Sequence, residues 1–450
     1  MTPLMNCPKE LQLSIFETLP FRDLSSISMA SKTLRLTVEP LLYFRIVLKW
    51  DKTNTQTPPI VPFLRTIISR PGLATFVRQI YLEGNDFHEK PGHWNMRPPT
   101  VSTADLEMDH ASQLIRETKI SEADIWIREL QTGNMDAVVA LLFSQLPKLQ
   151  SIHFQLNFTV INRWLGIMLR GALCEPSKHR LPSYKDVTKV KFSSQSREYR
   201  PDGYQNTQHV LPLFYLPKLH SLLVAVDSPA EFRWPSSAPT STSIRSLDLY
   251  RLRESRLRPL LWVLTGIETL KWDLWFQPDL DKEVSKDIVQ LDDLASAVCL
   301  LGNTLKSLTI TGESSPATSY GDYEPPPLEF RGSLDAMASA HNLQRLEIPW
   351  ALLMASFSPS SKRLRDGVPA SVEHLILTDD LSLNYDQWDW VDKSIIAVIE
   401  EELQHRQLTP SSLRRLSLQL WDCTQLPPVE ERERLELKAT QANIQLIWPE

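Results

Sequence analysis

The sequence predicts an α/β fold in which short parallel strands alternate with helices, after a small unit of three helices. Three observations predict this arrangement. A pattern of the form apolar-x-x-apolar-x-apolar returns ten times after residue 72, as expected for short strands with one buried face. Segments with helical periodicity precede several of these copies, and strands that alternate with helices form parallel sheets. Three shorter helical segments occupy the first 50 residues.

The composition argues against nucleic-acid and membrane partners. The chain has 450 residues, with 48 Lys and Arg against 54 Asp and Glu, which gives a net charge of −6. A nucleic-acid-binding domain usually carries a basic surplus, so we expect no nucleic-acid partner. No run of 18 apolar residues occurs, and the first residues lack the basic and apolar regions of a signal peptide. We therefore expect no membrane partner.

The cysteines predict a reducing compartment. They are too few and too far apart for a disulfide framework, and none forms a CxxC pair: Cys7, Cys174, Cys299 and Cys423. Reduced thiols are typical of proteins in the cytoplasm or the nucleus. We therefore expect a cytoplasmic or nuclear protein.

Residues 1–50 are predicted to form the unit of three short helices. Pro8 suits the first turn of the first helix, and Pro20 ends it. Asp23 and Ser31 are candidate N-caps of the second and third helices, and the third is predicted to stop before Pro40. The apolar residues of the first helix span an arc of about 200°, wider than the stripe of about 100° that one buried face needs. One side of this helix therefore either packs inside the unit or contacts a partner.

Residues 51–72 are predicted as a polar linker with a leading helix, and residues 73–450 as one repeat domain. The later copies of the strand pattern lie between 23 and 41 residues apart, so the repeat is irregular. The ten copies begin at Val77, Leu149, Val187, Leu219, Ile244, Ile267, Leu305, Leu343, Val372 and Leu413. A last strand is predicted at residues 443–448, after a charged helix at residues 429–439.

The segments between the copies are predicted as helices and inserts. The helices are predicted at residues 104–130, 136–146, 256–264, 287–301, 333–340 and 394–406. The inserts are loops rich in proline, serine or other polar residues, at residues 85–103, 227–243, 312–327 and 357–371. The repeat unit is therefore a helix, a tight polar turn and a short strand.

The N-terminal unit resembles a known family. The segments that carry the resemblance are Cys7-Pro8-Lys9-Glu10-Leu11, Ile15-Phe16, Leu19-Pro20, Asp23-Leu24, Ala30-Ser31-Lys32 and Leu34-Arg35. Their order and spacing resemble the F-box over residues 4–48, although Cys7 stands where a leucine usually opens the motif. The remaining 400 residues resemble the irregular leucine-rich-repeat arrays of fungal F-box proteins. The fold implied is an F-box followed by a leucine-rich-repeat horseshoe, with strands on the concave face and helices outside.

The resemblance implies a role without catalysis by this chain. F-box proteins are substrate receptors of cullin-RING ubiquitin ligases, in which the F-box docks on a Skp-family adaptor and the repeats hold the target. The adaptor contact is carried over to Pro8, Leu11, Ile15, Leu19, Leu24 and Leu34. The alternative for these residues is that they only build the N-terminal core. The alternative function is a protein-binding repeat scaffold outside a ligase, and a metabolic enzyme on an α/β fold is a third, weaker option.

In such a horseshoe, residues between and beside the inward apolar positions point along the concave surface. The candidates for target binding are Gln155, Lys191, Asp248, Tyr250, Lys271, Asp273, Thr309, Glu347 and Arg415. The alternative for each is plain exposure to solvent. Trp272 is expected in the core, because it takes an inward position, whereas Trp388 and Trp390 are equally compatible with surface and core.

Motifs for catalysis, cofactors and metals are not found in the sequence. It has no GxGxxG, Walker, HExxH or GxSxG motif, so we expect neither a cofactor nor enzymatic activity. His88 and His93 lack a third metal ligand, which favours a polar insert over a metal site. A reader of phosphorylated targets would need clustered arginines. Candidates for such a cluster are Arg251, Arg253, Arg256 and Arg258, although solvation at a helix start explains this run equally well.

Overall fold

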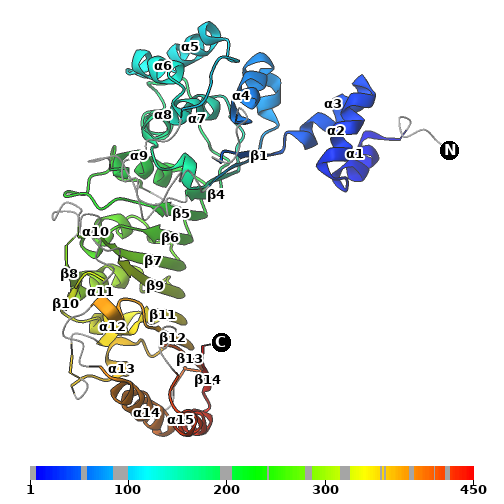
Figure 1. Cartoon of the computed structure of the whole chain (residues 1–450). Helices are drawn as coiled ribbons and strands as arrows, with labels where there is room; N and C mark the ends of the chain where they lie inside the picture. The colour runs from blue at the N-terminus through cyan, green and yellow to red at the C-terminus, as the bar shows by residue number, and fades with distance from the viewer. Residues whose placement is uncertain are drawn as a thin grey trace. The chain divides into compact units, whose positions relative to one another are not determined.

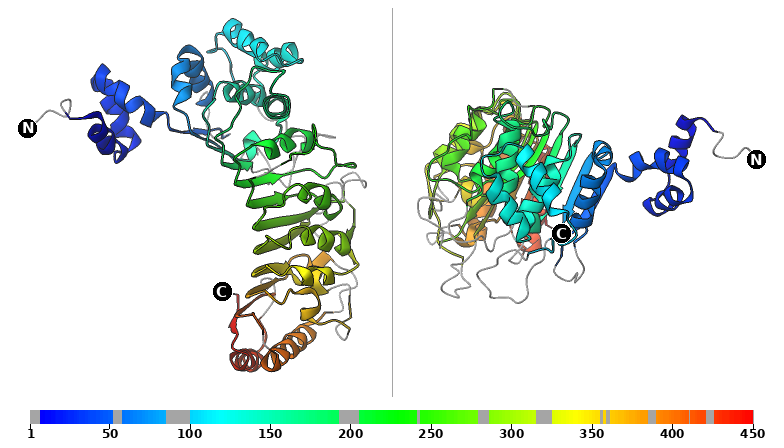
Figure 2. Two further views of the ribbon diagram at one scale, coloured as in Figure 1. Left: turned by 180° about the vertical axis from the view of Figure 1, so that it is seen from behind. Right: turned by 90° about the horizontal axis from the view of Figure 1, so that it is seen from above.

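The computed structural model describes residues 7–51, 58–84, 100–192, 205–240, 243–278, 286–314, 325–354, 357–358, 361–384, 390–409, 411–420 and 426–449. The chain forms two compact units. The first consists of Met1–Leu223 with Trp234–Ala238, and the second of Val224–Arg233 with Pro239–Glu450. Within each unit, helices lie along one side of parallel strands (Figures 1 and 2). No helix among the described residues is long and apolar enough to cross a membrane.

Three helices open the first unit: α1 (Lys9–Glu17), α2 (Phe21–Ala30) and α3 (Lys32–Leu42). Their buried cluster consists of Phe16, Leu24 and Val38, against which pack Leu19, Ile27, Leu34, Leu41 and Leu42. Pro8 takes the N-cap position of α1 and Ser31 that of α3, as predicted. The prediction for α2 was wrong, because Pro20 takes the N-cap position and Asp23 lies in the first turn.

Helix α3 continues through Pro40, whereas the sequence predicted that it stops before this residue. Proline removes one backbone donor and usually breaks a helix interior. Here Leu41 and Leu42, which follow the proline, pack against the cluster, and Tyr43 N still donates to Glu39 O at 3.0 Å. Burial of the two leucines therefore offsets the lost hydrogen bond.

The rest of the first unit alternates between helices and strands. Its strands are β1 (Arg45–Lys49), β2 (Gln79–Glu83), β3 (Ser151–Phe154), β4 (Lys189–Phe192) and β5 (Ser221–Ala225), of which β5 ends in the second unit. Its α-helices are α4 (Ile60–Ser69), α5 (Met108–Glu117), α6 (Ala123–Gln131), α7 (Met135–Ser144), α8 (Arg163–Leu173) and α9 (Thr207–Val210). Its 3₁₀ helices are η2 (Pro71–Thr75), η3 (Leu156–Phe158) and η4 (Leu211–Tyr215).

The second unit repeats this alternation. Its strands are β6 (Ser246–Tyr250), β7 (Thr269–Phe276), β8 (Ile288–Gln290), β9 (Ser307–Ser314), β10 (Glu329–Arg331), β11 (Arg345–Pro349), β12 (His374–Thr378), β13 (Arg415–Gln419) and β14 (Gln445–Ile447). Its α-helices are α10 (Glu254–Leu261), α11 (Leu291–Cys299), α12 (Trp350–Met354), α13 (Leu364–Gly367), α14 (Asp392–Leu408) and α15 (Val429–Gln441). Its 3₁₀ helices are η5 (Asp335–Ser339) and η6 (Ser382–Asn384).

Each copy of the predicted pattern forms a strand, and the strands pair in register. They are parallel and follow the chain order, from β1 to β5 in the first unit and from β6 to β14 in the second. Equal positions of the pattern face each other, as in Ile80 with Ile152 and Leu247 with Leu270. All three apolar positions of all ten copies are at most 2% exposed. Each repeat therefore adds one strand with its buried apolar side chains to the sheet. We call the rows of these buried side chains the buried ladder. Strands β8 and β10 form a separate parallel pair.

Further local predictions differ from the structure. The insert predicted at residues 357–371 contains the short helix α13, and the insert predicted at residues 312–327 begins inside strand β9. The single helix predicted at residues 104–130 is two helices, α5 and α6, separated by a turn in which Lys119 has a φ of +62°. The helix predicted at residues 287–301 begins as strand β8, because Val289 pairs with Phe330 of β10. The helix predicted at residues 333–340 is the 3₁₀ helix η5. Strand β1 was not predicted, because its short sequence forms a strand only through pairing with β2.

The cysteines within the described residues, Cys7, Cys174 and Cys299, are free thiols. Cys423 lies outside the described residues, as do His88, His93 and Trp388.

Candidate protein-binding surfaces

The three N-terminal helices separate the residues carried over for the adaptor into two groups. Leu11 and Ile15 lie one turn apart on α1 and are 56% and 46% exposed, and Pro8 before them is exposed as well. Leu24, in contrast, is 7% exposed inside the cluster of the three helices. Leu19 and Leu34 pack against that cluster. The first group is therefore open to a partner, whereas the second group builds the core.

Sequence reasoning did not select three further exposed apolar residues of these helices. Phe21 and Met29 on α2 and Leu36 on α3 are each more exposed than Leu11. The sequence offered a signal for their exposure. They are additional apolar residues on helices whose inward faces already carry Leu24 and Leu34. Large exposed apolar patches are typical of protein interfaces, so these residues are further candidates for a partner contact.

A polar face covers the side of each sheet opposite the buried ladder. Eight of the nine candidates for target binding lie on it, because side chains of a strand alternate between its two faces, whereas Gln155 follows the end of β3. In the second unit, the register brings Asp248 opposite Lys271, Lys271 opposite Thr309, and Thr309 opposite Glu347. Tyr250 lies opposite Asp273 on the same two strands. These six residues are neighbours, whereas Gln155 and Lys191 lie in the first unit.

The polar residues of the second unit interact with one another. Asp273 Oδ1 accepts a hydrogen bond from Thr311 Oγ1 at 2.6 Å, and Lys271 Nζ lies 5.8 Å from the centre of the Tyr250 ring. Arg345 Nη2 donates to Glu347 Oε2 at 2.7 Å. Part of the charge on this face is therefore balanced within the unit.

Arg415 lies at the edge of this network, beside His374. The ring of His374 contacts Arg345 Nη1 at 3.3 Å and Ser417 Oγ at 3.0 Å. Partial burial lowers the pKa of His374, and the positive charges of Arg345 and Arg415 lower it further. Arg415 itself is exposed. It is therefore a cation of the second unit that a partner can reach.

The first unit presents a different arrangement, which we call the first-unit strip: Arg45, Tyr81, His153, Lys189 and Lys191. The Arg45 guanidinium carbon lies 4.4 Å from the centre of the Tyr81 ring. The rings of Tyr81 and His153 meet edge to face, with their centres 5.5 Å apart. Lys191 lies opposite His153 in the register, and both lysines are exposed. Sequence reasoning selected only Lys191, since contact between Arg45 and Tyr81 depends on the unpredicted strand β1.

Gln155 has a structural role at the end of β3. Its Oε1 accepts a hydrogen bond from Gly84 N at 2.7 Å. Gly84 has a φ of +153°, and a Cβ atom at this position would lie 2.2 Å from Trp50 O. Asn157 closes the same corner, because its side-chain amide donates to Trp50 O at 2.5 Å. Gln155 therefore holds a tight corner of the chain.

The arginine run proposed as an anion pocket is engaged within its own unit. The side chain of Arg251 is 14% exposed, with Nε 3.4 Å from Asp227 Oδ1 and its guanidinium 4.3 Å from the centre of the Trp275 ring. Burial lowers the pKa of Arg251 to about 10. Arg253 pairs with Glu254 at 2.8 Å. Arg256 donates to the Pro229 carbonyl, and Arg258 donates to the Ser296 hydroxyl. The run therefore does not form an open anion pocket, whereas Arg258 stays exposed, as simple solvation predicts.

Two tryptophans of the second unit that the sequence singled out, Trp272 and Trp390, belong to its core. Trp272 is fully buried, and its Nε1 donates to Leu252 O at 2.7 Å, which confirms the predicted core position. Trp390 is also buried and packs edge-on against Trp350, with ring centres 5.1 Å apart. The open question about Trp390 is thus settled in favour of the core.

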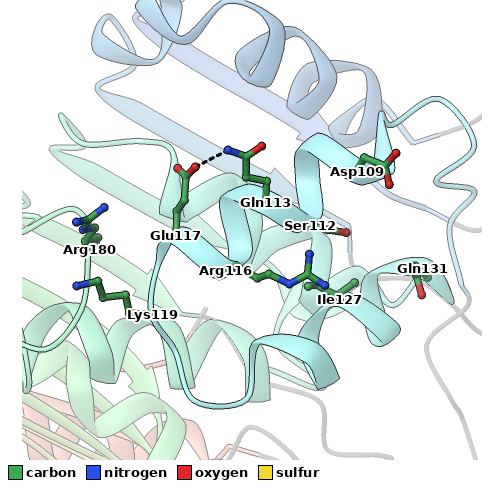
Figure 3. A pocket seen from close by; sticks show the side chains of 9 residues that line it. All are labelled: Asp109, Ser112, Gln113, Arg116, Glu117, Lys119, Ile127, Gln131 and Arg180. Carbon is green, nitrogen blue, oxygen red and sulfur yellow. Dashed lines mark hydrogen bonds between the residues drawn. The ribbon is translucent and has the colours of Figure 1, made fainter.

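A pocket of about 790 Å³ lies between α5 and α6 in the first unit. Figure 3 shows Arg116 between the two helices, with Lys119 and Arg180 together at one end and Asp109 toward the other. Gln113 Nε2 donates to Glu117 Oε1 at 2.8 Å at its rim. The pocket mixes cations and carboxylates, so its lining does not favour one ligand charge. No group of three or more His, Cys, Asp or Glu residues in the described part of the chain could hold a metal ion.

The comparison with known families concerns the repeats. Residues 52–246 match the family model of a leucine-rich repeat domain. The matched span contains β2 to β5 and the first residue of β6, and the same register of apolar positions continues through the second unit. No curated protein matches the chain. The match supports leucine-rich repeats and, with them, a protein-binding repeat scaffold.

Proposed function

We propose that the chain is the substrate-recognition subunit of a cullin-RING ubiquitin ligase. The helices α1 to α3 dock a Skp-family adaptor, and the repeats bind a target protein through the polar face of the sheet. Catalysis comes from the conjugating enzyme that the ligase recruits, so the chain itself is not an enzyme. The receptor acts by proximity, because it holds a target lysine near the activated conjugate. The protein acts in the cytoplasm or the nucleus.

The single observation that carries this proposal is the exposed apolar pair on α1. Leu11 and Ile15 belong to the segment that resembles the F-box, and both remain open to solvent beside a packed three-helix core. Burial of one such side chain contributes about 1.5–3 kcal/mol. An adaptor that covers both residues would gain part of the free energy that stabilises the complex.

The test is a binding assay with a purified Skp-family adaptor and its cullin. The double variant Leu11→Lys/Ile15→Lys places two charges in the proposed contact and should weaken adaptor binding by at least about a hundredfold. The matched control is Leu437→Lys, an equally exposed leucine on α15 in the second unit. It should leave adaptor binding unchanged.

The outcomes distinguish the two candidate functions. Recovery of adaptor and cullin with the wild type, lost in the double variant and retained in the control, supports the ligase. Binding of the adaptor without the cullin supports a non-ligase scaffold. No binding of the adaptor by a folded wild-type chain contradicts the ligase proposal.

A further inference from the structure

The sheet face of the first unit carries an excess of positive charge. Its outward positions on β1 to β4 include four cations, Arg45, Lys49, Lys189 and Lys191, and one carboxylate, Glu83. Glu83 lies 3.7 Å from Lys49 and so balances that cation. In the described part of the chain, the side chains of Lys189 and Lys191 make neither a hydrogen bond nor an ion pair. This excess occurs in a protein whose net charge is −6.

The aromatic residues occupy the centre of the first-unit strip. Tyr81 on β2 and His153 on β3 lie between Arg45 on β1 and the two lysines of β4. Neighbouring strands are about 4.8 Å apart, so the distance from β1 to β4 is about 14 Å. An extended peptide that crosses the strands covers this distance in about four residues, at about 3.3 Å per residue. The strip thus fits a short segment with separated charges.

We propose that the first-unit strip docks an extended acidic segment of the target protein. Acidic side chains near the two ends of the segment pair with Arg45 and with Lys189 and Lys191, and an apolar side chain between them covers Tyr81 and His153. The proposal rests on the proposed function in one respect, namely that the repeats bind a protein. It commits to a peptide, because the two rings lie between the cations and offer an apolar contact there.

His153 provides an independent signature of this contact. Partial burial lowers its pKa, Lys191 and Lys189 lower it further, and Glu83 acts in the opposite direction. The groups that face it are Tyr81 and Glu83 from β2 and the two lysines from β4. A docked carboxylate brings negative charge and raises the pKa of His153. The affinity for the peptide should therefore rise as the pH falls toward 6, and His153→Gln should remove this dependence.

The experiment measures peptide binding to the full chain by fluorescence anisotropy. The probe is a labelled nine-residue peptide with two glutamates near each end and a leucine in the middle, compared with its glutamine counterpart. The wild type should prefer the acidic peptide. Lys189→Glu/Lys191→Glu should weaken this binding about tenfold or more, and the milder Lys189→Gln/Lys191→Gln about threefold. The matched control is Arg415→Glu, an exposed cation on the sheet of the second unit, which should bind as the wild type does.

Adaptor binding by the same preparations separates this proposal from the proposed function. Variants that bind the adaptor normally but have lost the acidic peptide support the strip. Equal binding of the acidic and glutamine peptides, or equal loss in Arg415→Glu, overturns it. Tighter binding of a single-stranded RNA of equal charge than of the acidic peptide overturns it in favour of a nucleic-acid site. Loss of adaptor binding alone contradicts only the ligase.

Discussion

The sheet faces of the two units differ in how their charges are arranged. In the second unit, Arg345 pairs with Glu347, and Asp273 accepts a hydrogen bond from Thr311. In the first unit, the rings of Tyr81 and His153 separate cations that lack such partners among the described residues. The buried ladder beneath both faces is the same, with apolar positions that are at most 2% exposed. The comparison indicates that the repeats share one scaffold and differ in the charge of their outward positions.

The largest expected effect tests whether the two units share this scaffold. Ile152 in the first unit and Leu308 in the second occupy the same position of the strand pattern, and both are buried. Ile152→Ala and Leu308→Ala should each reduce the free energy of unfolding by about 2–5 kcal/mol, because each leaves a cavity in a packed core. Urea unfolding measures the loss. A near-neutral result for one of them would show that the two ladders are not equivalent.

A second prediction concerns glycines with different neighbours in the two units. The Cβ of an alanine at position 84 would lie 2.2 Å from a backbone oxygen of Trp50, whereas at position 312 it would meet the Leu381 side chain. Backbone cannot move aside as a side chain can. Gly84→Ala should therefore cost about 2–3 kcal/mol, and Gly312→Ala less. Thermal unfolding compares the two. Gly72→Ala, with no atom within 4 Å of the new Cβ, is the control.

A third prediction concerns the pH dependence of stability, which should differ between the two units. Asp136 of α7 is buried and accepts hydrogen bonds from Trp164 N at 2.6 Å and Leu165 N at 3.2 Å. Burial raises its pKa to about 7, although these bonds lower it. Because the native pKa lies above the unfolded value of 3.8, the stability from this group is present below pH 3.8 and is lost as the pH rises through about 7.

The measurement is the urea midpoint between pH 4 and pH 8. Asp136→Asn should flatten this pH dependence. Arg251→Met in the second unit should leave the slope of the urea midpoint against pH unchanged, because the pKa of Arg251 is about 10 and lies outside this range. An unchanged slope in Asp136→Asn would contradict the assignment of this pH dependence to the first unit.

The smallest expected effect compares two ion pairs. Arg70 Nη2 lies 2.7 Å from Glu39 Oε1, and Glu39 is buried where α3 meets the first repeat. Arg70→Ala leaves this carboxylate without its cation and should cost about 1–2 kcal/mol. The pair of Arg331 and Glu329 in the second unit is exposed on both sides, so Arg331→Ala should cost clearly less than Arg70→Ala. Equal losses in thermal unfolding would show that burial does not distinguish the two pairs.

The strand positions could be predicted because burial follows a local pattern. Leu305, Leu308 and Ile310 alternate with polar residues in one short segment, and this alternation is enough to predict β9 and its inward face. The outward row from Asp248 to Glu347 followed from the same alternation. The first-unit strip did not follow from it, because Arg45 reaches Tyr81 only when β1 pairs with β2.

The sequence by itself determined which residues of each repeat face inward. Apolar side chains at alternate positions of a strand all lie on one face, and burying that face removes all of them from water. Tertiary structure alone decided which outward or apolar residues remain available. Leu24 joined the core whereas Leu11 stayed exposed, and Arg251 pairs with Asp227 whereas the Lys191 side chain is exposed. The reason is that exposure and charge balance depend on neighbours far apart in the chain. The spacing of residues within one repeat does not predict those neighbours.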